Sequence, residues 1–103
     1  MEDLQEMLLE RQSRPIHPGE VLVDILEDLD ITQTAFAKAI GVSRRTVNEL
    51  IQGRRSLTVD MAIRIGKALG NGPRLWMNLQ QKVDLWDALQ AHREEYEKVS
   101  VID

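Results

Sequence analysis

The sequence has 103 residues, with 17 acidic and 13 basic side chains, a formal net charge of −4 and no cysteine. At this length we expect one domain, and the lack of cysteine excludes disulfides, thiolate metal sites and a cysteine nucleophile. No apolar run approaches the roughly 18 residues of a membrane span, and the acidic first residues do not fit a secretory signal. We therefore expect a soluble cytoplasmic domain. The net charge taken alone argues against nucleic acid as a partner.

The charge is distributed unevenly along the chain. Residues 1–30 carry −7, residues 31–75 carry +6 and residues 76–103 carry −3. Such an asymmetry favours separate electrostatic roles for separate surfaces, although solvated helix faces remain an alternative for the acidic ends. For the basic centre, the local sequence decides between these two interpretations.

The apolar pattern is helical throughout, and no period-two alternation persists, so we predict an all-α protein. A short amphipathic turn is indicated near the start of the chain. The first long helix is predicted to begin at Pro18, because proline is tolerated at a first helical position. Two sets of residues define these elements: Leu4, Met7 and Leu8 in the turn, and Leu22, Ile25, Leu26 and Leu29 in one buried stripe of the helix.

Three further helices have predicted N-caps at Thr32, Ser43 and Thr58, and a last, longer helix opens at Pro73. The helix after Thr58 is predicted to bury one face, and the last helix carries apolar residues at spacings of three and four. These faces comprise Ala62, Ile63, Gly66 and Leu69, then Trp76, Leu79, Val83 and Trp86. The predicted organisation is an N-terminal extension (1–14), a helical domain that includes the long last helix (15–97) and a tail (98–103).

Residues 33–52 predict a helix-turn-helix. Ala37 is small where two steeply crossing helices approach, and Gly41 stands where the turn needs a positive φ. Ser43 is placed to cap the second helix. The apolar contacts that hold the two helices together are predicted to come from Ile40, Val42, Val47 and Leu50.

The second helix leaves side chains exposed that read base edges in DNA. Arginine recognises guanine, asparagine or glutamine recognises adenine, and a threonine methyl group packs on thymine. They gather near the N-terminal end of the helix, which is the end that enters the major groove. Gln33 and the arginines after Gly53 are placed to hold phosphates. The candidate DNA-binding residues are Gln33, Ser43, Arg44, Arg45, Thr46, Asn48, Gln52, Arg54 and Arg55. Glu49 is unfavourable near phosphate unless it points aside or pairs with an arginine.

Three segments resemble the lambda-repressor-like (XRE) helix-turn-helix family, and within it the HigA-type antitoxins, also called virulence-associated protein I. They are Ile16-His17-Pro18-Gly19-Glu20, the run from Val42 to Leu50, and Leu75-Trp76-Met77-Asn78-Leu79-Gln80. The resemblance covers about residues 16–90, and its third segment, outside the generic fold, discriminates best. It implies a five-helix domain, a homodimer that represses its own operon, and a partner toxin that is a small basic ribonuclease.

Two departures from the family stand out. Residues 1–14 precede the usual start, and the first helix carries Asp24, Glu27 and Asp28 where many members hold phosphate with a basic residue. Because a ribonuclease presents basic surface, we expect these acidic residues to contribute to toxin binding. A free-standing regulator without a toxin is the alternative, and a protein-interaction module that has lost DNA binding is a second one.

The remaining residue groups do not indicate a metal site or an active site. His17 and Glu20 lack the further ligands of a metal site, so His17 is predicted to cap a helix or pin a loop. No nucleophile, base and acid occur together and no phosphate loop is present, so we expect neither an enzyme nor a cofactor. Trp76 is predicted to lie in the core. For a dimer interface, with core packing equally open, the candidates are Leu79, Val83, Trp86 and Leu89.

Overall fold

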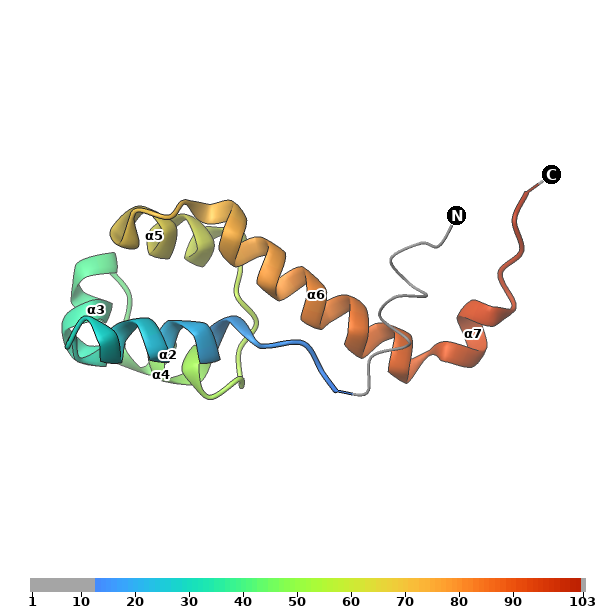
Figure 1. The fold of residues 1–103 in the computed structure, drawn as a ribbon, viewed down its shortest axis with the longest axis horizontal. Helices are drawn as coiled ribbons and strands as arrows, with labels where there is room; N and C mark the ends of the chain where they lie inside the picture. Colours follow the sequence, from blue (N-terminus) through green and yellow to red (C-terminus); the bar gives the residue numbers. More distant parts are fainter. Residues whose placement is uncertain (1–12, 103) are drawn as a thin grey trace.

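The structure is a computed structural model that describes residues 13–102, and this part of the chain is entirely helical. In chain order the helices are α2 (Pro18–Asp28), α3 (Gln33–Ile40), α4 (Arg44–Ile51), α5 (Val59–Leu69), α6 (Pro73–Ala91) and α7 (Arg93–Glu97). Helices α2 to α5 gather at one end of the molecule, and α6 runs away from them toward the C-terminus (Figure 1). The all-α, five-helix prediction is confirmed for α2 to α6, and the short α7 is added. The predicted turn at Leu4, Met7 and Leu8 lies outside the described residues.

The helix starts follow from side-chain caps. The hydroxyl groups of Thr32, Ser43 and Thr58 accept hydrogen bonds from the backbone N–H three residues later, at 3.0, 3.0 and 3.2 Å. Each bond satisfies one of the backbone donors that a helix leaves unpaired in its first turn. All three predicted N-caps are therefore confirmed.

The core lies between α2, α3, α4, α5 and the first half of α6. Its fully buried large side chains include Leu22, Val47, Leu50, Ile65 and Trp76. Trp76, predicted as core, also donates from Nε1 to Oδ1 of Asn71 at 2.9 Å. No helix in the described range is long and apolar enough to cross a bilayer.

Two predicted core positions are wrong. Leu29 is 53% exposed because α2 ends at Asp28 and the chain turns before the next apolar position can face inward. Ile63 is 52% exposed because α5 buries Met61, Ala62, Ile65 and Gly66, a stripe that leaves position 63 on its flank. Ile65 takes the place that the spacing assigned to Ile63.

Two glycines allow close backbone approaches between helices. A Cβ atom on Gly19 would lie 2.0 Å from the carbonyl oxygen of Leu50, so α2 contacts the end of α4 through bare backbone. A Cβ atom on Gly66 would lie 2.3 Å from the carbonyl carbon of Gly72, where the chain turns from α5 into α6. Because the contacted atoms are backbone, no side-chain movement could make room at either position.

The single long last helix of the prediction is divided at His92, whose φ of −123° and ψ of 27° leave the helical region. Residues 90–102 are all exposed. Helices in proteins draw most of their stability from packing an apolar face, and this support ends after the buried Leu89. The chain therefore continues as the short α7 rather than as more of α6.

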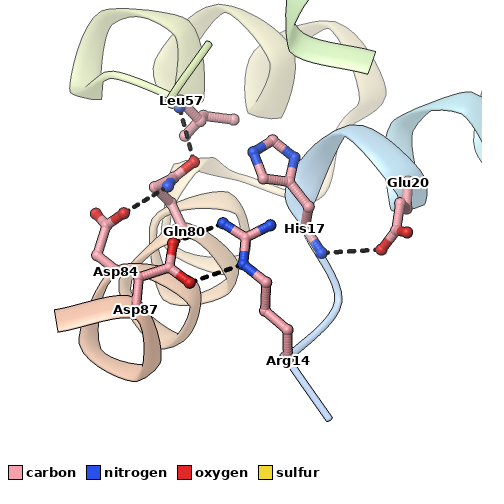
Figure 2. Close-up of polar contacts among 7 residues, drawn as sticks. All are labelled: Arg14, His17, Glu20, Leu57, Gln80, Asp84 and Asp87. Atoms are coloured by element: carbon pink, nitrogen blue, oxygen red, sulfur yellow. Dashed lines mark hydrogen bonds and ion pairs between the residues drawn. The ribbon is translucent and has the colours of Figure 1, made fainter. Parts of the chain in front are cut away.

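The segment ahead of α2 is tied to α6 by polar contacts (Figure 2). Arg14 donates from Nε and Nη2 to the two carboxylate oxygens of Asp87 at 2.8 and 2.6 Å. These hydrogen bonds are the main reason that the pKa of Asp87 is lowered and that of Arg14 is raised. Nearby, the buried Gln80 accepts from the backbone N–H of Leu57 at 2.8 Å and donates to Asp84 at 2.8 Å. The Arg14–Asp87 and Gln80–Leu57 contacts join segments distant in sequence, and no sequence pattern predicts them.

Candidate nucleic-acid interface

Helices α3 and α4 form the predicted helix-turn-helix. Gly41 ends α3 with a φ of 77°, in the left-handed conformation that the turn was predicted to need. Ala37 is buried at the crossing, as are Ile40, Val47 and Leu50, and Val42 packs against them. The predicted geometry of this unit is confirmed.

A contact that the sequence analysis missed holds the turn from α5. The guanidinium of Arg64 donates from Nη1 to the carbonyl oxygen of Ile40 at 2.8 Å and from Nε to Asp60 at 2.8 Å. The last carbonyl groups of a helix lack partners within it, so this bond stabilises the end of α3. Spacing of four between Asp60 and Arg64 signals their ion pair, but nothing in the sequence signals the bond to Ile40.

A side-chain hydrogen bond joins the starts of the two helices. Asn48 of α4 donates from Nδ2 to Oε1 of Gln33, the first residue of α3, at 3.1 Å. The amide nitrogen of Gln33 and the carbonyl oxygen of Asn48 keep their own hydrogen-bonding capacity. The two predicted DNA-binding residues are thus brought together and orient each other.

Ser43 and Thr46 serve the local structure of α4. Thr46 donates its backbone N–H to the hydroxyl oxygen of Ser43 at 3.0 Å, and the two hydroxyl oxygens are 2.9 Å apart. The Ser43 hydroxyl therefore caps the helix and the Thr46 hydroxyl is paired with it, so the methyl group of Thr46 is the part of its side chain left for an apolar contact. Arg44, at the first position of α4, is exposed and has no ion pair among residues 13–102.

Glu49 lies between two arginines, which resolves the unfavourable position noted for it. Its Oε1 lies 3.4 Å from Nε of Arg45 and 3.3 Å from Nη2 of Arg55. The side chain of Arg45 is still 86% exposed, and that of Arg55 is 44% exposed. The carboxylate therefore holds both guanidinium groups beside α4 while it neutralises part of their charge. Gln52 and Arg54, the remaining predicted DNA-binding residues, are exposed at the end of α4 and just after it.

The predicted toxin-binding residues lie elsewhere. Asp24, Glu27 and Asp28 are all exposed on α2. Glu20, on the same helix, is engaged locally, because its Oε2 accepts the backbone N–H of His17 at 3.0 Å. The three exposed carboxylates thus form an acidic surface on a helix separate from α3 and α4.

The four candidates for a dimer interface do not form one exposed face. Val83 and Leu89 are buried within the single chain, and Leu79 and Trp86 are half-buried. The alternative that the sequence left open, core packing, holds for Val83 and Leu89. Of the four, Leu79 and Trp86 keep surface that a second chain could cover.

His17 caps α2, as predicted. Its Nδ1 accepts the backbone N–H of Gly19 at 2.9 Å, and with Glu20 it forms a reciprocal capping box. Burial, reinforced by the positive charge of Arg14, lowers the pKa of His17 and keeps the ring neutral. In the described range no group of three or more His, Asp or Glu side chains is placed to hold a metal ion.

Comparisons with known proteins find relatives that are similar to this chain in sequence and in fold. The family model described as helix-turn-helix matches residues 22–76. Antitoxin HigA-1 of Vibrio cholerae is 48% identical over 83 residues, which are 80% of this chain and 78% of that protein. A solved structure from Nostoc punctiforme, a provisionally named antidote protein of a plasmid maintenance system, is 67% identical with a TM-score of 0.77, covering 88% of this chain and 100% of that one. The antitoxin HigA of Pseudomonas aeruginosa, solved with the higBA promoter, is 38% identical with a TM-score of 0.81. The match covers 87% of this chain and 100% of that one.

Proposed function

The chain belongs to the HigA-type antitoxins of the helix-turn-helix family, and from this premise we propose that it binds operator DNA as a repressor of its own operon. The observation that carries the proposal is the pairing of Gln33 with Asn48 beside the exposed Arg44. They support the proposal because an amide suited to phosphate and side chains suited to base edges share one surface, over a packed helix-turn-helix.

In the proposed complex, α4 enters the major groove with its N-terminal end first. Arg44 and Arg45 are placed to donate to guanine and Asn48 and Gln52 to pair with adenine, while Thr46 offers a methyl group to thymine. The amide of Gln33, at the N-terminus of α3, binds a phosphate, as do Arg54 and Arg55 behind α4. The phosphate contacts set the register of the protein on the duplex, and the contacts of α4 select the sequence.

A two-fold homodimer would place two α4 helices in half-sites about 34 Å apart, and such an operator would be palindromic. The partner toxin is proposed to be a small basic ribonuclease, bound in part by the acidic surface of Asp24, Glu27 and Asp28. Because this surface lies on α2, apart from α4, one copy could hold toxin and DNA by different faces.

DNA binding is tested with the DNA upstream of the gene, measured by fluorescence anisotropy over a series of salt concentrations. The wild type should bind with an affinity that falls steeply with salt, because phosphate contacts release counterions. Arg44→Ala should lose about 1–3 kcal/mol, concentrated at one base pair of the operator. Lys82→Ala, on an exposed face of α6, is the matched control. A wild type that binds no better than to random duplex would contradict the proposal.

Toxin binding is tested by a pull-down with the product of the neighbouring reading frame, followed by charge reversal. The double variant Glu27→Lys, Asp28→Lys should weaken the complex at least tenfold and leave operator binding intact. Reversal of Glu94 and Glu95, which are exposed on α7, is the control. An unchanged affinity for the toxin would remove α2 from the interface, and a neighbour that does not bind would favour a free-standing regulator.

A further inference from the structure

An apolar groove opens on the surface between the α2–α3 loop, α3 and α5, away from the residues assigned to DNA. The described residues that line it are all apolar. They include Leu29, Ile31, Ala35, Ala39, Ala68 and Leu69. Leu29 and Ile31 are 53% and 37% exposed, so the groove leaves large apolar side chains in contact with water. Contiguous exposed apolar surface of this kind marks interaction sites.

Charged residues of both signs lie next to residues that line the groove. On the α5 side, an adjoining hollow that shares Ala39 and Ala68 is lined by Arg64 and Lys67. Arg64 is engaged with Asp60, whereas Lys67 has no ion pair among residues 13–102. Asp28 and Asp30 are exposed and flank in sequence Leu29, which lines the groove at the end of α2. An occupant should therefore be apolar, with an acidic group toward α5 and a basic group toward the loop.

The C-terminal arm of this chain, residues 93–102, has these properties. Val99, Val101 and Ile102 are 75%, 89% and 95% exposed. They follow the acidic residues of α7. Directly before them, Lys98 and Glu97, the latter within 3.5 Å of Nε of Arg93 and 68% exposed, supply one charge of each sign. In an extended segment Val99 and Val101 point to the same side, so together they present one apolar edge.

The arm cannot reach the groove of its own chain. The helices that form the groove lie at one end of the molecule and the C-terminus lies at the other (Figure 1), along a length of 53 Å. We propose that the C-terminal arm of one copy occupies the groove of a second copy, and that the exchange is reciprocal. A reciprocal exchange about a two-fold axis closes the assembly as a dimer, in which each copy contributes one arm and one groove. This contact does not use α4, so it stands apart from the proposed DNA contacts, and it adjoins the proposed toxin surface only at Asp28.

The first test measures the dimer dissociation constant of the full chain by sedimentation. An arm variant, Val101→Asp with Ile102→Asp, and a groove variant, Ala39→Glu with Ala68→Glu, should each raise it at least tenfold. All four positions are exposed, so thermal unfolding of the variants should match the wild type. Val59→Asp, at a 60% exposed apolar position outside the groove, is the control and should leave the dimer unchanged. A monomeric wild type, or an arm variant that dimerises normally, would overturn the proposal.

The second test mixes the two variants. Each alone lacks both reciprocal contacts, but the mixture restores one of them, between the intact arm of the groove variant and the intact groove of the arm variant. Heterodimers should therefore form where neither variant dimerises alone. Because the chain has no cysteine, Ala39→Cys and Val101→Cys chains can also be mixed and oxidised. The expected product is a disulfide between unlike chains, in excess over like pairs and over a Val59→Cys control; a statistical mixture would contradict the exchange.

Discussion

Asn48 donates a hydrogen bond to Gln33 across the helix-turn-helix, from Nδ2 to Oε1 at 3.1 Å. The contact joins the first residue of α3 to the middle of α4, fifteen residues later. It restrains two flexible side chains before any DNA is present, so less conformational entropy is lost when each meets its own target. The position proposed to bind phosphate and the position proposed to read bases are thereby coupled.

Because of this coupling, substitutions of the two residues should not act independently. Gln33→Ala and Asn48→Ala should each weaken operator binding, and the double variant should lose less than their sum. We expect a coupling energy of about 0.5–3 kcal/mol in a double-mutant cycle of dissociation constants. Gln33→Ala with Arg54→Ala, whose side chains share no contact, serves as the additive control. Strict additivity of the Gln33 and Asn48 effects would mean that the two residues act separately on DNA.

Removal of the carboxylate of Glu49 should strengthen binding to DNA. In Glu49→Gln, Arg45 and Arg55 lose a competing partner, and Arg55 becomes fully available to the phosphate proposed for it. Each added phosphate contact steepens the slope of log affinity against log salt by about 0.9, so an increase of about 1 is expected. Stability should change by less than about 1 kcal/mol because both arginine partners are open to solvent, with side chains 86% and 44% exposed.

The control for Glu49→Gln is Asp60→Asn, which removes the similarly spaced partner of Arg64 on α5. It should leave the salt slope unchanged. If Glu49→Gln also left the slope unchanged, Arg55 would not contact a phosphate.

Gly19→Ala should destabilise the fold strongly. The new Cβ would lie 2.0 Å from the carbonyl oxygen of Leu50, and only a backbone shift of α2 against α4 could relieve the overlap. We expect a loss of about 3 kcal/mol or more in the free energy of unfolding by urea, at the upper end of overpacking costs. Gly70→Ala is the comparison, because there the new Cβ meets open space. Its only expected cost is the backbone strain of an alanine at a φ of +78°, about 1–2 kcal/mol. Equal losses from the two substitutions would exclude the close contact.

Acidification should destabilise the protein through His17. Its pKa is lowered from 6.5 in the folded state, chiefly by burial, so the unfolded chain binds the proton more readily. The contribution of the neutral ring to the free energy of unfolding is therefore fully present above pH 6.5. It is lost progressively as the pH falls from 6.5 toward the lower folded-state pKa. Protonation would also remove the Nδ1 acceptor that caps α2.

The measurement is the urea midpoint between pH 7.5 and pH 5 for the wild type and His17→Asn. Asparagine can cap the helix without titrating in this range, so the variant should show a flatter profile. His92→Asn, at an exposed position, should keep the slope of the wild type. A wild-type midpoint independent of pH would show that the capping imidazole does not titrate differently on unfolding.

The local sequence determined much of this protein. Thr32, Ser43 and Thr58 begin their helices, and Gly41 ends one, through contacts within four residues, so the pattern of residue types predicts them. The helix-turn-helix and the exposed arginines of α4 follow from these boundaries and from helical periodicity. The family resemblance was readable for the same reason, since its motifs consist of caps, turns and apolar spacings.

Tertiary structure decided the remainder. Three hydrogen bonds join residues that are 23 to 73 positions apart in the sequence. They link Arg64 to Ile40 at the end of α3, Arg14 to Asp87, and Gln80 to Leu57. Such bonds depend on where whole helices pack, which no local spacing encodes. The same applies to burial: Leu29 and Ile63 fit an apolar stripe but face water, while Val83 and Leu89, candidates for an interface, are covered within one chain. Periodicity fixes the angle of a side chain around its helix, but only the packed neighbours determine whether that angle meets protein or solvent.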